Sequence, residues 1–221
     1  MKRYAPGELL GQGKTIITAH SACEGTLPNS REHIRAAIES GAEMIEVDVR
    51  RAPDGHLYLA HDVPQDISAC PTLDELFEQV APQENLCMNL DVKTEGLIED
   101  VMTLAARFDL QQRIVFTGAC NADRALANAL GGEMWRSVWD KALLNAGIAD
   151  NRADGSPLLN VYFGMISEEA ERELRADGGT FSAWTVDREA DIRRFLQMGI
   201  GNITTRQPVL AMRLRREIQG I

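Results

Sequence analysis

The sequence predicts an α/β protein, and more specifically a closed (β/α)8 (TIM) barrel that residues 1–221 form as one domain. Strand-like and helix-like segments alternate about eight times with short connections, which is typical of parallel strands joined by helices. Eight such units in 221 residues fit a closed barrel better than an open, doubly wound sheet. No Gly-x-Gly-x-x-Gly follows the first strand, and this disfavours a dinucleotide-binding fold.

The expected elements follow from hydrophobic periodicity and from cap residues. Residues 1–14, with three glycines, are predicted to be an irregular lead-in. Strands are expected at residues 15–19, 44–49, 57–60, 86–92, 113–117, 134–138, 158–163, 180–186 and 202–204. Helices are expected at residues 31–40, 72–80, 95–108, 122–130, 141–148, 167–176, 188–198 and 209–218. The strand at 57–60 is the one irregularity, because the Asp54-Gly55 turn makes it a short β-hairpin extension after the second strand.

Composition excludes several classes of protein. Hydrophobic residues make up 44% of the chain and charged residues 25%, so the chain can bury a core. A net charge of −10 argues against a nucleic-acid partner, which would require a basic patch. The N-terminus lacks the apolar region of a signal peptide, and no run approaches the roughly 18 apolar residues of a membrane span. We therefore expect a cytoplasmic protein without stable membrane insertion; the sequence does not specify its oligomeric state.

The cysteines and two of the histidines are expected to have no catalytic role. The four cysteines are scattered and form no Cys-x-x-Cys, so free thiols are favoured over zinc ligands or disulfides. Cys23 is interpreted as a small space-filling residue. His33 on a helix and His56 at a turn are predicted to be solvated.

The second strand carries the main chemical signal. Glu46 and Asp48 lie between the apolar residues of residues 44–49, so both carboxylates point to the same face. They are about 7 Å apart along the strand, which is close enough to share one cation. A solvated strand face is the simpler alternative for the pair taken alone.

Other polar residues are expected at the same end of the barrel, because active sites of such barrels lie at the C-terminal ends of the strands. His20 ends the first strand, His61 follows the hairpin, and Asp91, Lys93 and Trp184 lie on later strands. Oxygen-only ligands favour Mg²⁺ or Ca²⁺ over zinc. Lys93 suits a phosphate oxygen, although taken alone it could form a surface ion pair with Asp91. Two histidines can share acid and base roles. Together these residues predict metal-assisted cleavage of a small phosphodiester.

The chain resembles the glycerophosphodiester phosphodiesterase family of phospholipase-C-like barrels from about residue 15 to residue 214. Residues 41–62, with Glu46-Val47-Asp48 and His61-Asp62, resemble its second-strand motif. Residues 89–93, Asn-Leu-Asp-Val-Lys, resemble its third-strand motif, with Asp where Glu is usual. Residues 183–186 and 199–208 resemble its closing segment.

This resemblance implies specific residue roles. The metal would be bound at Glu46, Asp48 and Asp91, and His20 and His61 would act as acid and base. Lys93 would lie near the phosphate. The implied activity is hydrolysis of a glycerophosphodiester, or a similar small phosphodiester, to an alcohol and glycerol phosphate.

The chain departs from the family pattern near its first strand. The usual His-Arg-Gly is His20-Ser21-Ala22, so a phosphate-binding arginine is missing, and we expect Ser21 to be a substrate-binding residue beside Lys93 and Trp184. The usual Pro-Glu-Asn-Thr is shortened to Pro28-Asn29-Ser30, which removes a glutamate. Only residues 62–70 separate the hairpin from the next helix, so a more open site is expected.

The departures leave two alternatives to the predicted hydrolase. One is a catalytically silent barrel that binds a phosphorylated ligand or a partner protein. The other is a phosphodiesterase directed at phospholipids, which the absence of an evident membrane-binding segment disfavours.

Overall fold

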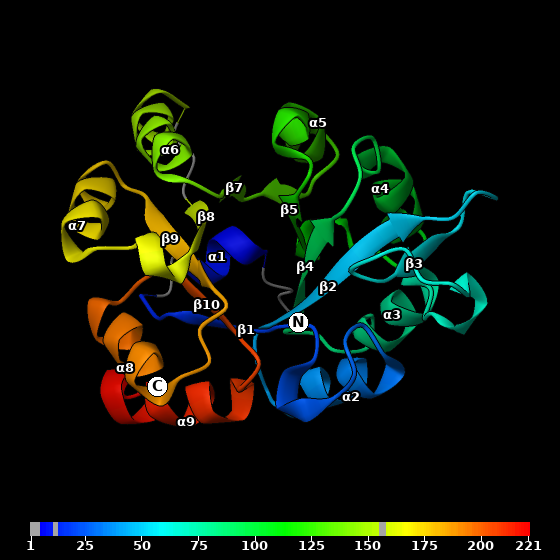
Figure 1. The fold of residues 1–221 in the computed structure, drawn as a ribbon, viewed down its shortest axis with the longest axis horizontal. Helices are drawn as coiled ribbons and strands as arrows, with labels where there is room; N and C mark the ends of the chain where they lie inside the picture. The colour runs from blue at the N-terminus through cyan, green and yellow to red at the C-terminus, as the bar shows by residue number, and fades with distance from the viewer. Residues whose placement is uncertain (1–4, 11–12, 155–157) are drawn as a thin grey trace.

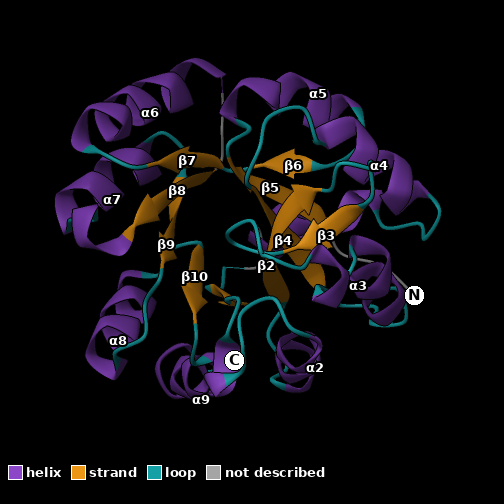
Figure 2. Cartoon of the chain, turned by 45° about the vertical axis from the view of Figure 1, so that its right-hand side comes forward, coloured by secondary structure: helices purple, strands orange, loops and turns teal. Residues whose placement is uncertain are grey.

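Parallel strands form a ring, and the helices that connect them lie around its outside (Figures 1 and 2). The computed structural model describes residues 5–10, 13–154 and 158–221. The strands are β1 (Ile16–Ala19), β2 (Met44–Arg51), β3 (Leu57–Leu59), β4 (Cys87–Val92), β5 (Ile114–Gly118), β6 (Glu133–Met134), β7 (Arg136–Val138), β8 (Leu158–Tyr162), β9 (Thr180–Trp184) and β10 (Asn202–Thr205). The α-helices are α1 (Pro6–Leu10), α2 (Arg31–Glu39), α3 (Leu73–Val80), α4 (Ile98–Ala106), α5 (Arg124–Ala129), α6 (Lys141–Asp154), α7 (Glu168–Ala176), α8 (Glu189–Met198) and α9 (Pro208–Gln219). Short 3-10 helices lie at Cys23–Gly25, Ile67–Ala69, Gln111–Arg113, Asn121–Asp123 and Phe163–Met165.

The strand order confirms the predicted barrel. Hydrogen-bonded neighbours run β6-β5-β4-β2-β1-β10-β9-β8-β7, and all pairs along this path are parallel. The two ends of the path, β6 and β7, are consecutive pieces of one segment that Trp135 interrupts. β6 pairs with β5 and β7 pairs with β8, so this segment changes partner at Trp135 and nearly closes the ring. The sequence predicted it as one continuous strand.

The predicted hairpin extension is also present. β3 pairs with the end of β2 in antiparallel register, from Val49↔Leu59 to Arg51↔Leu57. Gly55 in the turn has φ 96°, a left-handed conformation that glycine adopts without steric cost. This hairpin carries the chain back toward the barrel mouth, where it delivers His61.

The lead-in differs from the irregular segment that its glycines suggested. Pro6–Leu10 forms helix α1, which lies within the ring of strands in Figure 1. Leu9 is 3% exposed and packs with buried side chains from the barrel interior. These are Ile16, Met44, Cys87, Val115, Trp135 and Leu158. The backbone N–H of Gly7 donates to Glu133 Oε1 at 2.6 Å, which fixes α1 to β6. Residues 1–4 and 11–12 of the predicted lead-in lie outside the described residues.

Side-chain caps begin several outer helices as expected. Ser30 Oγ accepts from His33 N at 3.0 Å, Thr72 Oγ1 from Glu75 N at 3.2 Å, and Ser167 Oγ from Ala170 N at 3.1 Å. Each bond satisfies one of the free N–H groups of a first helical turn. The helices then bury their apolar faces against the strands.

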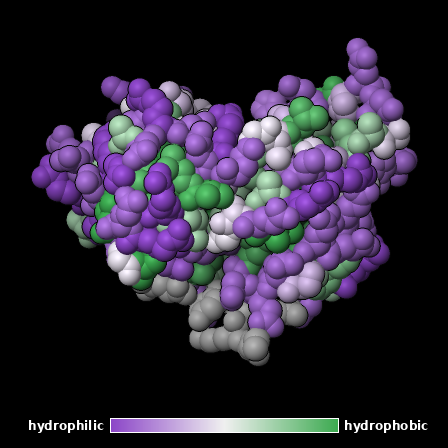
Figure 3. Space-filling view, turned by 90° about the horizontal axis from the view of Figure 1, so that it is seen from below, coloured by the Kyte–Doolittle hydropathy of each residue, from purple (hydrophilic) through white to green (hydrophobic). Residues whose placement is uncertain are grey.

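The surface agrees with the polar composition of the chain. The face in Figure 3 is mostly hydrophilic, with smaller hydrophobic patches. Among residues 5–10, 13–154 and 158–221, no helix has the length and apolar character that crossing a bilayer requires.

Candidate active site

One cavity of about 510 Å³ opens where the barrel strands end. The eight residues that the sequence singled out all line it: His20, Ser21, Glu46, Asp48, His61, Asp91, Lys93 and Trp184. His20 and Lys93 directly follow β1 and β4, and Trp184 is the last residue of β9. The cavity therefore lies at the C-terminal end of the barrel, where (β/α)8 enzymes have their active sites.

Strand register brings three carboxylates together. Asp48 on β2 lies opposite Asp91 on β4, and Glu46 lies opposite Asn89. One oxygen from each of Glu46, Asp48 and Asp91 lies within 4.8 Å of the other two. We call these three residues the carboxylate cluster. Alternation along β2 and pairing with β4 therefore produce a group that could share one ion.

Lys93 is the cation in direct contact with this cluster. Its Nζ lies 2.7 Å from Asp48 Oδ1 and 2.8 Å from Asp91 Oδ2. Burial tends to raise the pKa of Asp48, but the charge and hydrogen bond of Lys93 outweigh it, so that pKa is lowered. The pKa of Asp91 is raised, because its burial outweighs the same lysine. One ammonium group thus serves two of the three carboxylates.

Glu46 is the least compensated member of the cluster. Burial first, and then the charges of Asp48 and Asp91, raise its pKa well above the ordinary value. Its Oε2 accepts from the backbone N–H of Ser21 at 2.8 Å and lies 4.0 Å from His20 Nε2. This carboxylate is held in place but lacks a close permanent cation among the described residues.

The cluster fits a divalent cation by two further observations. Asp91 Oδ1 is buried and has no hydrogen-bond partner among the described residues. A Cβ on Gly118, whose φ is 88°, would collide with that oxygen and with the carbonyl of Val92, so the glycine leaves the space that the carboxylate occupies. Three carboxylates against one ammonium leave net negative charge that a hard cation with oxygen ligands would neutralise.

The two histidines occupy different parts of the cavity. The His20 side chain is 21% exposed and lies beside Glu46, and burial is the main cause that lowers its pKa. The His61 side chain is 67% exposed at the rim, with Nδ1 3.2 Å from Asp62 Oδ1. Arg50 donates to the His61 carbonyl from Nε at 3.0 Å and from Nη2 at 2.6 Å, which fixes the end of the hairpin. One imidazole is therefore deep in the cavity and the other open to solvent.

Aromatic side chains form part of the wall. The Trp184 ring lies edge-on to Tyr162 with a centroid separation of 5.9 Å. Trp139, 53% exposed, also lines the cavity, and the sequence analysis did not identify it.

Two further residues of the site were missed from the sequence. Asn29 is buried, with φ 53°; its Nδ2 donates to Asp48 Oδ2 at 2.7 Å and its Oδ1 accepts from Asp48 N at 2.9 Å. Arg206 follows β10 and lines the cavity. The available signals were that Asn29 comes just before a helix cap and that Arg206 comes just after a barrel strand.

The prediction that His33 is solvated was wrong. Its side chain is 0% exposed, and neither ring nitrogen has a hydrogen-bond partner among the described residues. His33 and Ala37 are four residues apart on α2, so both lie on the core-facing side of the helix. Burial, with the nearby charge of His20, lowers the pKa of His33 to about 4.

His56 is exposed, as predicted. The cysteines are free thiols, also as predicted, and Cys23 is fully buried.

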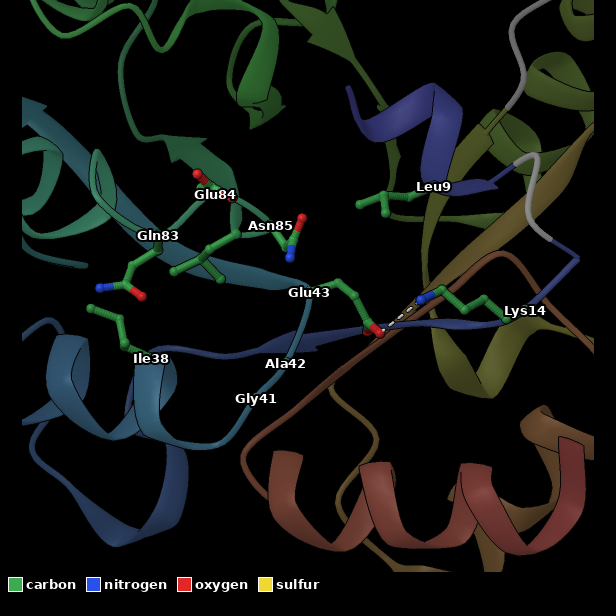
Figure 4. Close-up of a pocket in the computed structure, with 10 residues that line it drawn as sticks. Leu9, Lys14, Ile38, Gly41, Ala42, Glu43, Gln83, Glu84 and Asn85 are labelled. Atoms are coloured by element: carbon green, nitrogen blue, oxygen red, sulfur yellow. Dashed lines mark hydrogen bonds and ion pairs between the residues drawn. The ribbon is translucent and has the colours of Figure 1, made fainter. Parts of the chain in front are cut away.

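A second cavity, of about 470 Å³, lies at the opposite ends of the strands (Figure 4). Its lining includes Leu9, Lys14 and Glu43. Leu9 is on α1, Lys14 comes shortly before β1, and Glu43 directly precedes β2. Lys14 Nζ bonds Glu43 Oε1 at 3.1 Å, and Arg215 contacts both oxygens of Glu43 at 2.6 and 2.8 Å. Glu43 is thus paired with two cations, and this cluster connects the starts of β1 and β2 to α9.

Comparisons with known proteins agree with this geometry. The model of the glycerophosphoryl diester phosphodiesterase family matches residues 20–93, the segment that carries most of the polar cavity residues. A glycerophosphodiester phosphodiesterase of Caldanaerobacter subterraneus is 24% identical over 92% of this chain and 99% of its own.

Solved structures share the fold. The glycerophosphodiester phosphodiesterase of Thermotoga maritima has a TM-score of 0.74 and 20% identity, over 91% of this chain and 98% of its own. An Oleispira antarctica phosphodiesterase in complex with the product sn-glycerol-3-phosphate has a TM-score of 0.74 and 18% identity, over 93% and 98%. The fold, the cavity and these relatives define a phosphoric diester hydrolase built on a (β/α)8 barrel. Within that class, the chain is similar to the glycerophosphodiester phosphodiesterase family: the family model matches residues 20–93, and a relative of that name aligns over 92% of the chain.

Proposed function

We propose that the protein hydrolyses glycerophosphodiesters, or similar small phosphodiesters, to an alcohol and glycerol phosphate in a metal-dependent reaction. The observation that carries this proposal is the single cavity in which the carboxylate cluster, two histidines and a lysine face one another. The relatives named as glycerophosphodiester phosphodiesterases support the substrate class.

Glu46, Asp48 and Asp91 would hold the divalent ion, with Mg²⁺ or Ca²⁺ favoured by their oxygen ligands. When bound, such an ion polarises the phosphoryl oxygens and neutralises charge that develops on them. Ser21 and Asn29 keep the carboxylates oriented, since each donates a hydrogen bond to one of them. Lys93 provides a further positive charge beside the cluster.

The two histidines would divide the proton transfers according to their positions. His20, deep in the cavity, accepts the proton of the glycerol hydroxyl that attacks phosphorus. His61, at the exposed rim, donates a proton to the alcohol oxygen as its bond to phosphorus breaks. Water then opens the resulting cyclic phosphate to give glycerol phosphate. Trp184 and Ser21 would contact the substrate from the cavity wall.

The experiment measures release of choline from glycerophosphocholine with Mg²⁺ or Ca²⁺ and after treatment with EDTA. Wild type should turn over only with the metal, and His20→Ala and His61→Ala should each reduce kcat by at least 100-fold while remaining folded. His56→Ala is the matched control, because His56 is exposed outside the cavity and should retain full activity.

The same assay separates the alternatives. Near-normal rates in either site variant would refute the two-histidine assignment, and activity in EDTA would refute metal dependence. A folded wild type that turns over neither glycerophosphocholine nor other glycerophosphodiesters would favour the catalytically silent barrel. Activity confined to phospholipid vesicles would favour the phospholipid-directed alternative.

A further inference from the structure

Arg206 lies beside the deep histidine of the active site. It directly follows β10, whose Thr205 pairs with Ala19 at the end of β1. The backbone N–H of His20 donates to the Thr205 carbonyl at 2.9 Å, so the two strand ends are held together. The pairing of β1 with β10 thus places Arg206 next to His20, and both residues line the cavity.

The cationic side chains of the cavity are not equally available to an anion. The ammonium group of Lys93 is already shared between Asp48 and Asp91, at 2.7 and 2.8 Å. Ser21 brings no positive charge, and its hydroxyl lies 3.4 Å from Asp48 Oδ2. With a divalent ion bound, the ion and Lys93 only balance the three carboxylates, so a phosphodiester, itself an anion, still lacks a positive partner of its own.

Arg206 is suited to that role because it is anchored at one side only. Asp187 Oδ2 accepts from its Nη1 at 2.7 Å, and Asp187 Oδ1 accepts from its backbone N–H at 2.8 Å. Within the described part of the chain, no bond is seen for Nε or Nη2, and the side chain is 49% exposed. The anchor limits the rotamer freedom that binding would otherwise cost, and the remaining N–H groups form a fork that matches two phosphate oxygens.

The strand register also places Arg206 close to the residue that would take part in proton transfer. Ala19 pairs with Thr205, so His20 and Arg206 are the next residues along two neighbouring strand ends. Both residues line the cavity that would hold the substrate.

We propose that Arg206 binds the phosphoryl oxygens of the substrate and so supplies, from β10, the bidentate contact that Ser21 does not supply from β1. This inference rests on the proposed function for the identity of the substrate, but it concerns a phosphate-binding residue that can be tested without turnover.

The test is isothermal titration of inorganic phosphate into the protein with Mg²⁺ present. Arg206→Ala should weaken phosphate binding by roughly 10- to 100-fold, the usual effect of losing hydrogen bonds to a charged group. Arg206→Lys should recover part of the affinity, because it retains a charge without the fork. Arg188→Ala is the control: Arg188 is 79% exposed, pairs with Asp191 outside the cavity, and should leave the affinity within about twofold of wild type.

The outcomes distinguish this inference from the proposed function. If wild type hydrolyses no glycerophosphodiester but binds phosphate in an Arg206-dependent way, the function is wrong and the inference stands. If wild type is active while Arg206→Ala keeps its phosphate affinity and its KM, the inference is overturned and the function stands. Absence of phosphate binding in wild type also overturns the inference. Circular dichroism of each variant verifies that it is folded.

Discussion

Replacing Asn29 should weaken metal binding, although Asn29 is not itself a member of the carboxylate cluster. Its amide makes two reciprocal bonds with Asp48, at 2.7 and 2.9 Å, and so fixes the orientation of that carboxylate. Its φ of 53° lies in the left-handed region, where asparagine is tolerated better than alanine. Asn29→Gly therefore removes the side-chain amide but allows the left-handed backbone conformation without strain. Asn29→Ala removes the same amide and also strains the backbone.

The contacts set the expected size of the effect. The bond to the charged Asp48 oxygen is worth about 2 kcal/mol, and leaving the buried Asp48 N–H unpaired costs about 1 kcal/mol more. Asn29→Gly should therefore lower the free energy of unfolding by about 3 kcal/mol, and Asn29→Ala by about 1 kcal/mol more than that. Because Asn29 orients the Asp48 carboxylate, its loss should reduce the affinity for Mg²⁺ or Ca²⁺ by about 10- to 100-fold.

Two measurements check this prediction: urea denaturation without metal, and titration calorimetry with each ion. Leu9→Ala is the control for lost stability alone, because Leu9 packs at the other end of the barrel and a buried Leu→Ala change costs about 2–5 kcal/mol. It should leave metal affinity unchanged. If Asn29→Gly binds the ion within threefold of wild type, Asn29 does not position Asp48 for metal binding.

Two other predictions concern Gly118 and Glu43. Gly118→Ala should reduce metal affinity by more than about tenfold in the same titration, because the new Cβ would displace Asp91. Gly55→Ala, with φ 96° and no neighbour within 4 Å, is the matched control for strain alone; equal affinities in the two variants would contradict the collision argument. At Glu43, burial opposes ionisation, but the two bonds from Arg215 outweigh it and lower the pKa below the ordinary 4.5. The pair therefore stabilises the fold above pH 4.5 and loses this effect as the pH falls through the lowered pKa, so urea midpoints should fall with pH below 4.5 in wild type and less steeply in Glu43→Gln. Parallel curves for the two proteins would refute that account.

Local patterns were sufficient for the barrel and for most of the cavity. Alternation places Glu46 and Asp48 on one face of β2 whatever the strand packs against, because the side-chain period of a strand is two. Parallel strands share one C-terminal edge, so His20, Asp91 and Lys93 could be expected there before their neighbours were known. Ser30 and Thr72 cap their helices through bonds that span three residues.

The lead-in shows where local patterns were insufficient. A five-residue helix at Pro6–Leu10 has little intrinsic stability, and its glycine suggests loop. Packing of Leu9 inside the barrel and the bond from Gly7 to Glu133, 126 residues away, stabilise it instead. The exchange of partners at Trp135 also depends on two different neighbouring strands, and no local pattern in residues 133–138 encodes it.

The sequence by itself determined the (β/α)8 architecture and the identity of the carboxylates, histidines and lysine at the barrel mouth. These features could be predicted because strand alternation, helix periodicity and helix capping depend only on residues that are close together in the chain. Only the tertiary structure decided that Asn29 supports Asp48, that His33 is buried, and that Arg206 comes to lie beside His20. Those relations join residues up to 186 positions apart, through a ring that exists only after β1 and β10 have paired.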